Sequence, residues 1–441
     1  MNKDKLFAIL NDWNYWFKPL KKTYPRNFYE EKLKKLSQAK EIIVLKGVRR
    51  SGKSTLLLNE QKRLLKTLNP KNILFVNLED MRFNEFDKTT LLEDIKNVYL
   101  EYIAPKGDIV LMLDEIQNIP LWEKWVLKEY ELTNNQIYIT GSNSHLLSSE
   151  FSTALSGRYL SLDVYPLSFK EFLEFKGIKI SSKAEYINQK IHIAHLFREY
   201  MQFGGFPKIT LLEDEELKKE LLGSYYDTIL LKDIVARYKL KNYNLLNELA
   251  TFLLINNSTI NALNKLKNNF NVSFDLIKDY VEYLTNAYMI FTINKFDFSY
   301  KKQIANPKKF YSIDTGLSNR FSFSKNQGSN LENIVFLELK RRYKEIYYYK
   351  TNNNLECDFY VKDANLAIQV SVTLDDEKTL KRELRVFKEL QKELKNITPL
   401  LITMDETQKY QYEDMTILAI NVIEWILDFH INDTIEHKNK L

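Results

Sequence analysis

The sequence predicts an α/β fold whose first part is a parallel sheet flanked by helices. Three observations support this prediction. Short apolar runs alternate with helical patterns from residue 41 to about 165, a phosphate-binding motif follows the first run, and two carboxylates end the third. Strands of a parallel sheet are buried on both faces, so they appear as continuous apolar runs. The runs are EIIVL, NILFVNL, DIVLMLDE, NQIYIT and YLSLDVY.

Length and composition bound the class of protein. A chain of 441 residues with 44% hydrophobic and 28% charged residues predicts several globular domains and excludes disorder and fibrous repeats. One cysteine excludes a disulfide framework and a multi-cysteine metal site. The amino terminus does not match a signal peptide, and no run is long enough for a membrane span, so we expect a cytoplasmic protein without a membrane partner. The net charge of +6 permits an anionic partner without requiring one.

Changes in hydrophobic pattern divide the chain into four predicted parts. The lead-in has apolar residues at helical spacing at Leu6, Leu10, Trp13 and Phe17. The predicted parts are a helical lead-in (1–40), an α/β domain with the phosphate-binding motif (41–165), a mostly helical region (166–300) with a winged helix at about 243–300, and a mixed α/β domain (301–441).

The segment GVRRSGKST follows the first predicted strand and opens a predicted helix, which is the required context for a P-loop. Its glycines let backbone N–H groups turn toward an anion, and the helix amino terminus adds partial positive charge. Lys53 is placed to reach the β- and γ-phosphates, and the Ser54 hydroxyl to bind Mg²⁺. The predicted nucleotide-binding residues are Gly47, Val48, Arg49, Arg50, Ser51, Gly52, Lys53, Ser54 and Thr55.

The third predicted strand ends in two adjacent carboxylates. Asp114 would hold the hydrated Mg²⁺ together with Ser54, and Glu115 would orient and deprotonate the attacking water. Strands often end in acidic residues at their solvent edge, so the pair alone is weak evidence for a metal site. Its position after the P-loop in the sequence makes it an indication of one. A glutamate beside the metal-binding aspartate favours hydrolysis of a nucleoside triphosphate over phosphoryl transfer to another substrate.

Three further residues are candidates for a role in hydrolysis. Ser142 and Asn143 follow the next strand, where a polar side chain would contact the γ-phosphate or the water; a plain polar turn is the alternative. Arg158 precedes the fifth strand and would act as an arginine finger, in its own chain or toward a neighbouring subunit. The alternative for Arg158 is a surface arginine at the start of a strand.

Taken together, these motifs resemble a known family. GVRRSGKSTLL, LDEIQNIPLWEKWV, YITGSNSHLLSSE, LSGR, YPLSFKEF and GGFP are similar to segments of bacterial and archaeal AAA-plus-type ATPases that often carry a C-terminal domain of unknown function. The resemblance covers nearly the whole chain. It implies ATP rather than GTP, a winged helix after the ATPase domain, and a C-terminal domain distantly similar to PD-(D/E)xK nucleases.

The winged helix also has support from the residues themselves. YNLLNELATFLLIN, STINALNKLK and SFDLIKDYVEYLTNA are predicted helices, and YMIFTINKF is a predicted strand of a hairpin. Ser273 is the expected N-cap of the third helix. This helix carries Asp275, Asp279 and Glu282, which repel phosphate, so a helical packing module is as good an interpretation as a DNA reader.

The resemblance to PD-(D/E)xK nucleases assigns four positions in the C-terminal part. Glu332 and Asp358 match the helix glutamate and the strand aspartate that bind Mg²⁺. The Glu-x-Lys positions are held by Gln369 and Ser371, which lack the carboxylate and the ammonium. We therefore expect a degenerate site without cleavage, unless a lysine such as Lys362 has taken over the missing charge.

The leading hypothesis is a Mg²⁺-dependent ATPase whose cycle rearranges the winged-helix and nuclease-like domains on or near double-stranded DNA. One alternative is a slow ATP-dependent switch that recruits a protein partner. A less favoured one is an ATP-regulated nuclease. An arginine finger that acts between subunits would make the protein an oligomer.

Overall fold

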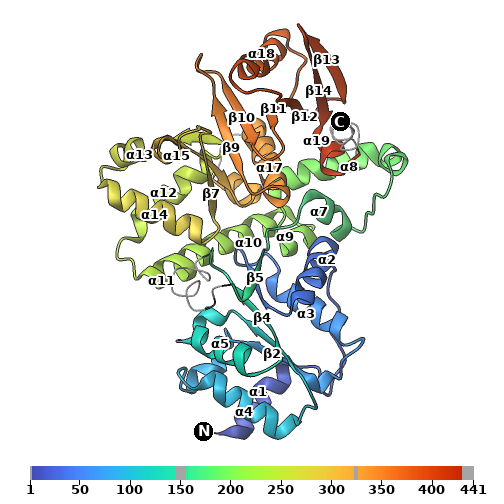
Figure 1. The fold of residues 1–441 in the computed structure, drawn as a ribbon, viewed down its shortest axis with the longest axis vertical. Helices are drawn as coiled ribbons and strands as arrows, with labels where there is room; N and C mark the ends of the chain where they lie inside the picture. The colour runs from blue at the N-terminus through green and yellow to red at the C-terminus, as the bar shows by residue number, and fades with distance from the viewer. Residues whose placement is uncertain (1, 145–154, 156, 322–325, 430–441) are drawn as a thin grey trace. The chain divides into compact units, whose positions relative to one another are not determined.

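The computed structural model describes residues 2–144, 155, 157–321 and 326–429. The chain forms two compact units, Met1–Tyr165 and Pro166–Leu441. The architecture is mixed α/β: a P-loop type parallel sheet, then a helical region, then a second large sheet (Figure 1). The predicted fold class is therefore confirmed. The bounds of the four predicted parts stay predictions.

The sheet of the first unit contains the five predicted strands. They pair in the order β2-β3-β4-β1-β5, and every pairing is parallel. The strands are β1 (Ile42–Lys46), β2 (Ile73–Asn77), β3 (Val110–Asp114), β4 (Gln136–Gly141) and β5 (Tyr159–Asp163). Because the strands are parallel, the loops that follow β1, β3 and β4 leave the sheet at the same edge.

Helices cover both faces of this sheet, and alternate strand residues form the two halves of its core. Ile42 and Val44 point to one half, whereas Ile43 and Leu45 point to the other. The first half is covered by α1 (Lys3–Trp13), α4 (Leu91–Ile103) and α5 (Trp122–Leu132), and the second by α2 (Asn27–Leu36) and α3 (Lys53–Leu64). Single 3-10 segments lie at Ser37–Ala39, Pro70–Asn72, Met81–Glu85 and Ile116–Asn118.

The predicted lead-in is part of this core. Leu6 and Leu10 of α1 are fully buried, whereas Phe17 lies beyond the helix end and is 66% exposed. Asn14 follows α1, and its side chain hydrogen-bonds the backbone of β2 as a neighbouring strand would. Its side-chain amide donates to the Phe75 carbonyl and its side-chain oxygen accepts from the Phe75 N–H, both at 2.8 Å. Asn14 thus satisfies backbone groups of the edge strand β2, which would otherwise lack partners.

The second unit begins with a helical region. Helix α8 (Lys183–Phe203) is followed by its C-cap Gly204, where φ is +75° and a Cβ would lie 1.8 Å from the Asp314 carboxylate. That carboxylate accepts the Gly205 N–H at 2.7 Å, so the glycine pair allows Asp314 to hold the helix end. The elements are α7 (Phe169–Phe175), α8 (Lys183–Phe203), α9 (Pro207–Leu211), α10 (Glu215–Thr228), a π-helical segment (Ile229–Val235) and α11 (Ala236–Tyr238).

A compact helix–strand module follows. Strands β6 (Thr259–Asn261), β7 (Ile290–Asn294) and β8 (Lys308–Ser312) form an antiparallel sheet in the order β6-β8-β7. Three helices accompany it: α12 (Tyr243–Ile255), α13 (Leu263–Phe270) and α14 (Phe274–Asn286). The sequence predicted a helix over STINALNKLK, but its first residues form β6, because Thr259 and Ile260 pair with β8. Ser273 caps α14 as predicted, with its hydroxyl accepting the Leu276 N–H at 3.2 Å.

The last part contains a six-stranded mixed sheet in the order β13-β14-β12-β11-β10-β9. Helix α18 packs Leu384, Phe387 and Leu390 on one face of it, so its charge-rich sequence has one apolar side. The strands are β9 (Ile346–Lys350), β10 (Glu356–Val361), β11 (Leu366–Ser371), β12 (Thr398–Thr403), β13 (Gln408–Tyr412) and β14 (Met415–Asn421). The helices are α15 (Tyr300–Ala305), α16 (Thr315–Asn319), α17 (Gln327–Arg342), α18 (Glu377–Glu393) and α19 (Val422–Ile426). No helix within the described ranges is both long and apolar enough to cross a membrane.

Asn14→Ala tests the support of the edge strand. The change removes both hydrogen bonds to Phe75 and leaves two buried backbone groups unpaired, so we expect the free energy of unfolding to fall by about 2–3 kcal/mol. Urea denaturation measures it. Asn11→Ala, on the half-exposed side of the same helix, is the matched control and should change stability by less than about 0.5 kcal/mol. Equal losses in the two variants would contradict the role of Asn14.

Candidate functional site

The loop between β1 and α3 is shaped by two glycines. Gly47 has φ +154°, and a Cβ there would lie 2.1 Å from the Val164 carbonyl oxygen, so only glycine fits at this position. Gly52 has φ +97° and immediately precedes α3. Arg50 also has a positive φ, of +69°, which is uncommon for a residue with a side chain. This backbone places the loop at the amino terminus of α3, in the form that the motif predicted.

Lys53 lies inside this loop. Its side chain is 3% exposed, and its ammonium donates to the carbonyls of Gly47 at 3.0 Å and Val48 at 3.1 Å. The hydroxyl of Ser51 is buried and makes no hydrogen bond within the described part of the chain. Ser54 and Thr55 follow in the first turn of α3 and are half-buried. The loop thus gathers a positive charge and polar donors around the helix amino terminus.

The structure brings Asp114 and Glu115 to the same edge of the sheet. Thr140, at the end of β4, joins the two residues: its hydroxyl donates to the Asp114 carboxylate at 2.5 Å and accepts the Glu115 N–H at 3.0 Å. Glu115 has φ +55°, a left-handed conformation that costs energy for a non-glycine residue. The Glu115 carboxylate lies 3.8 Å from the Lys53 ammonium. The P-loop and the carboxylate pair therefore form one cluster.

The two carboxylates differ in acidity. Burial raises the pKa of Asp114 to about 6, and the neighbouring charge of Glu115 adds to the increase, while hydrogen bonds from Thr140 and Ser54 oppose it. Burial also favours protonation of Glu115, but the charges of Lys53 and Arg49 outweigh it and hold the pKa of Glu115 below its usual value. Glu115 is therefore ionised at neutral pH, and its carboxylate is available to accept a proton.

The remaining candidates of the first unit fall in two places. The Ser142 hydroxyl hydrogen-bonds the Glu115 carboxylate, and the adjacent Asn143 is fully buried. Arg158 lies at the opposite edge of the sheet, where its carbonyl accepts the N–H of Ile42 at the start of β1, at 3.1 Å. Its guanidinium forms a half-exposed ion pair with Glu131 at 3.1 Å. Residues 145–154 and 156, which include HLLSSE of the YITGSNSHLLSSE motif and Ser156 of the LSGR motif, lie outside the described residues.

Sequence reasoning missed three residues that shape this cluster. Arg26 is buried and donates to the Ser51 carbonyl at 2.9 Å, which braces the P-loop from the segment before α2. Gln117 donates to the Glu115 carboxylate at 2.5 Å. Thr140 is the third, as described above. For Thr140 and Gln117, the sequence shows only a polar residue at the end of an apolar run, in QIYIT and LDEIQ. Such a residue does not indicate which group it will contact.

Three of the four nuclease-like positions, Glu332, Asp358 and Gln369, lie together in the second unit, but they do not form a set of free metal ligands. Asp358 accepts the Val370 N–H at 2.9 Å, and Gln369 accepts the Asp358 N–H at 2.7 Å. Glu332 accepts the hydroxyl of Tyr311 at 2.7 Å. Ser371 instead donates to the Thr373 carbonyl at 2.9 Å.

A lysine does reach this cluster, but it is not the one considered from the sequence. Lys362 is exposed and lies 3.5 Å from Glu345. Lys309 of β8 is buried, and its ammonium lies 2.7 Å from Glu332 and 3.0 Å from Asp358. No sequence spacing could have indicated it, since Lys309 precedes the predicted nuclease helix and belongs to a different sheet.

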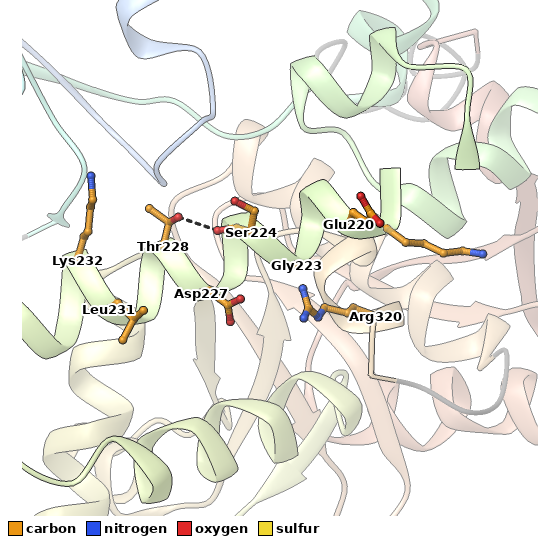
Figure 2. A pocket seen from close by; sticks show the side chains of 9 residues that line it. Glu220, Gly223, Ser224, Asp227, Thr228, Leu231, Lys232 and Arg320 are labelled. Atoms are coloured by element: carbon orange, nitrogen blue, oxygen red, sulfur yellow. Dashed lines mark hydrogen bonds between the residues drawn. The ribbon is translucent and has the colours of Figure 1, made fainter. Parts of the chain in front are cut away.

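Residues of the second unit along α10 and the π-helical segment line an open pocket of about 690 Å³. Figure 2 shows these side chains. Arg320 lies against α10 at Gly223, where a Cβ would come within 1.7 Å of the guanidinium. The lining mixes the basic Lys219, Lys232 and Arg320 with the acidic Glu220 and Asp227. We assign no ligand to this pocket, because the mixed charges favour neither anions nor cations.

Comparison with protein families places three domains along the chain. Residues 39–173 match the model of an AAA domain. Residues 194–328 and 327–423 match two domains of unknown function, DUF8612 and DUF4143. The AAA match covers the P-loop, the carboxylate pair and all five strands of the first sheet.

Two relatives match over most of the chain. An uncharacterized protein of Methanocaldococcus jannaschii is 36% identical over 377 residues, which cover 83% of this chain and 82% of the relative. An uncharacterized protein of Haemophilus influenzae is 31% identical over 412 residues, which cover 90% of this chain and 98% of the relative. The chain belongs to their family. The AAA-type P-loop fold that the sequence motifs predicted for this chain is confirmed.

Two solved structures are similar to this chain in fold at low sequence identity. A Walker-type ATPase of Pyrococcus abyssi is 14% identical, with a TM-score of 0.42 and coverage of 68% of this chain and 96% of that chain. The AMPPCP-bound DnaA of Aquifex aeolicus is 12% identical, with a TM-score of 0.28 and coverage of 63% and 92%.

Asp114→Asn tests the electrostatics of the cluster. With a pKa of about 6 in the folded state and 3.8 as reference, Asp114 binds a proton in the folded protein that the unfolded chain releases between these pH values. Its contribution to the free energy of unfolding therefore falls as the pH rises from about 4 to 6. We expect Asp114→Asn to be more stable than the wild type by about 1–3 kcal/mol at pH 7.5, with the gain vanishing near pH 4.

Urea denaturation without nucleotide at the two pH values measures this difference. Asp108→Asn, at an exposed position of the same unit, is the matched control and should show no such pH dependence. A constant difference between Asp114→Asn and the wild type across this pH range would contradict the buried, destabilising carboxylate.

Proposed function

We propose that the first unit binds ATP with Mg²⁺ and hydrolyses the nucleotide. The observation that carries this proposal is the single cluster of Lys53, Asp114 and Glu115 beside the amino terminus of α3. Its members come from two loops separated by about sixty residues in the sequence, and they meet because β1, β4 and β3 are neighbours. The match of residues 39–173 to an AAA domain supports the same conclusion.

The loop suits a polyphosphate. Helix α3 has no side-chain N-cap, so its first N–H groups are available to phosphate oxygens. The buried Ser51 hydroxyl adds a further donor. Lys53 bonds to two loop carbonyls, and a phosphate would offer its ammonium a charged and therefore stronger acceptor.

The residues also suit a magnesium ion. The hydroxyl of Ser54 hydrogen-bonds the Asp114 carboxylate, so two oxygen ligands of the kind that Mg²⁺ prefers already lie together. When bound, Mg²⁺ would neutralise phosphate charge during cleavage of the terminal phosphate. Thr140 fixes the orientation of the Asp114 carboxylate through its hydroxyl.

Glu115 is the proposed general base. Its carboxylate is ionised, and Gln117 and Ser142 fix its direction through hydrogen bonds. A fixed carboxylate can hold a water molecule and accept its proton as the water attacks. Ser142 and Asn143 are proposed to contact the same water or the γ-phosphate, because both are buried beside Glu115.

Lys53→Ala and Glu115→Gln separate binding from hydrolysis. We expect Lys53→Ala to lower nucleotide affinity at least about tenfold, because it removes a charged hydrogen bond to phosphate. Glu115→Gln should bind ATP as well as the wild type but turn it over about 100-fold more slowly, because the amide cannot accept the proton. Fluorescent-nucleotide titration measures affinity, and phosphate release measures turnover.

Glu31→Gln is the control, since Glu31 is an exposed acid on α2. It should behave as the wild type in both assays. Wild-type turnover in Glu115→Gln would refute the base assignment, and unchanged affinity in Lys53→Ala would refute the phosphate assignment.

We infer that Arg158 lies too far from the P-loop of its own chain to contact the nucleotide there. As an arginine finger, Arg158 would contact the nucleotide bound by a neighbouring copy of the chain. The P-loop follows the carboxyl end of β1, whereas Arg158 pairs with Ile42 at the amino end of that strand. A five-residue strand is about 15 Å long, which exceeds the reach of an arginine side chain. An arginine finger at this position therefore requires an oligomer, in which two chains together complete the site.

For the second unit we propose a winged-helix module at residues 243–312. The order α12, β6, α13, α14, β7, β8 and the sheet order β6-β8-β7 support this proposal. The segment 295–307, between β7 and β8, corresponds to the wing. We call it the wing segment.

The wing segment, rather than α14, is the proposed contact to double-stranded DNA. Phe298 and Tyr300 are 83% and 73% exposed, and Lys301 and Lys302 beside them are also exposed. Exposed aromatic rings next to lysines suit the phosphates and base edges of nucleic acid. In contrast, the solvent face of α14 carries Asp275, Asp279 and Glu282 against a single lysine, Lys278, which disfavours phosphate contact.

The double variant Lys301→Glu/Lys302→Glu tests this surface. We expect its affinity for double-stranded DNA to fall at least about tenfold and its binding to depend less steeply on salt, because two phosphate contacts are lost. Fluorescence anisotropy with a DNA duplex measures both. ATP turnover should be stimulated by DNA in the wild type and not in the variant.

Lys278→Glu on α14 is the matched control and should bind DNA as the wild type does. A larger loss with Lys278→Glu would place the contact on α14 instead. Slow ATP turnover that DNA does not change, together with absent DNA binding, would favour the switch that recruits a protein partner.

A further inference from the structure

A buried lysine lies where three carboxylates of the second unit converge. The Lys309 side chain is 2% exposed, and its ammonium lies 2.7 Å from Glu332, 2.7 Å from Glu356 and 3.0 Å from Asp358. An ammonium group has three N–H donors, and three carboxylates accept them here. Lys309 is therefore a fixed positive charge.

We propose that Lys309 is an internal counter-ion which occupies the position that a nuclease-like fold would give to its metal, so that this cluster binds no divalent cation and cleaves no nucleic acid. The residues do not fit a metal site, because the oxygens that would bind it already hold an ammonium. Across the described ranges, no group of three or more histidine, cysteine, aspartate or glutamate side chains is arranged to hold a metal ion.

The surrounding hydrogen bonds support this assignment. The Gln369 side chain accepts the Asp358 N–H at 2.7 Å and donates to the buried Glu383 carboxylate at 2.6 Å. A glutamate at position 369 could not donate to Glu383 and would place two negative charges together. This network therefore requires an amide at position 369. A nuclease would carry a carboxylate at this position, but a carboxylate here would disrupt the contact between β11 and α18.

The cluster also joins two sheets. Lys309 belongs to β8 of the three-stranded sheet, whereas Glu356 and Asp358 belong to β10 of the six-stranded sheet. A second connection comes from the wing segment itself: the Phe296 N–H donates to the Tyr348 carbonyl of β9 at 2.8 Å, and the Phe296 ring packs against the Tyr360 ring with 4.8 Å between ring centres. The ion cluster and this connection fasten the proposed winged helix to the C-terminal sheet.

Lys309→Met tests the counter-ion. Removing the ammonium leaves three carboxylates without compensation, so we expect calorimetry of the full chain to show Tm of the second unit lowered by about 10 °C. Lys308→Met, the half-buried neighbour on the same strand, is the matched control and should shift Tm by less than about 2 °C. In Lys309→Met/Glu332→Gln, one of the three carboxyl groups is also replaced by an amide that cannot ionise, and we expect part of the lost Tm to return.

A loss of Tm that Glu332→Gln does not relieve would mean that Lys309 acts by packing, which would overturn the proposal. Metal binding is tested independently in folded variants, by Mn²⁺ titration followed by electron paramagnetic resonance without nucleotide. Asp358→Asn should bind as many Mn²⁺ ions as the wild type. One Mn²⁺ fewer per chain in Asp358→Asn, or Mn²⁺-dependent DNA cleavage that is lost in this variant, would overturn the proposal.

Discussion

The parallel pairing of β4 with both β1 and β3 is the constraint on which the candidate site depends. In this register Lys46 lies beside Gly141, and Leu113 lies beside Ile139, so the loops after the three strands emerge together. The P-loop, the carboxylate pair and Ser142 come from these loops. A shift of either pairing by one residue would turn the strand side chains to the other face and separate Thr140 from Asp114.

The first unit accommodates a locally unfavourable arrangement at this edge. Glu115 has a left-handed backbone, and Asp114 is a buried carboxylate whose pKa is raised. Both are stabilised by surrounding groups, since Thr140 bonds to the pair and Lys53 lies near Glu115. This arrangement lowers the stability of the first unit, and the extensive core on both faces of its sheet offsets that loss. Thr140 thus fixes the two carboxylates in place without a proposed role in the reaction itself.

The second unit uses a similar cluster of charges in the opposite way. Around Lys309 the ammonium is held by three carboxylates of the same chain, and Gln369 places an amide that satisfies two neighbours. At the P-loop the positive charge of Lys53 is opposed chiefly by loop carbonyls and one carboxylate at 3.8 Å, which leaves it able to bind an anion. The balance of charge within each cluster, rather than the residue types alone, separates a ligand site from a structural one.

The sequence by itself determined the five strands, the P-loop, the positions of Asp114 and Glu115 and the cap of α14, because each depends on neighbours along the chain or on strand periodicity. It could not determine β6 within STINALNKLK, the exposure of Phe17, the bridging role of Thr140, the brace from Arg26 or the partner of Glu332. These depend on strand pairing and on contacts between residues far apart in the sequence. A side chain such as Lys309 acquires its role only when folding brings the opposite charges to it and removes water from between them.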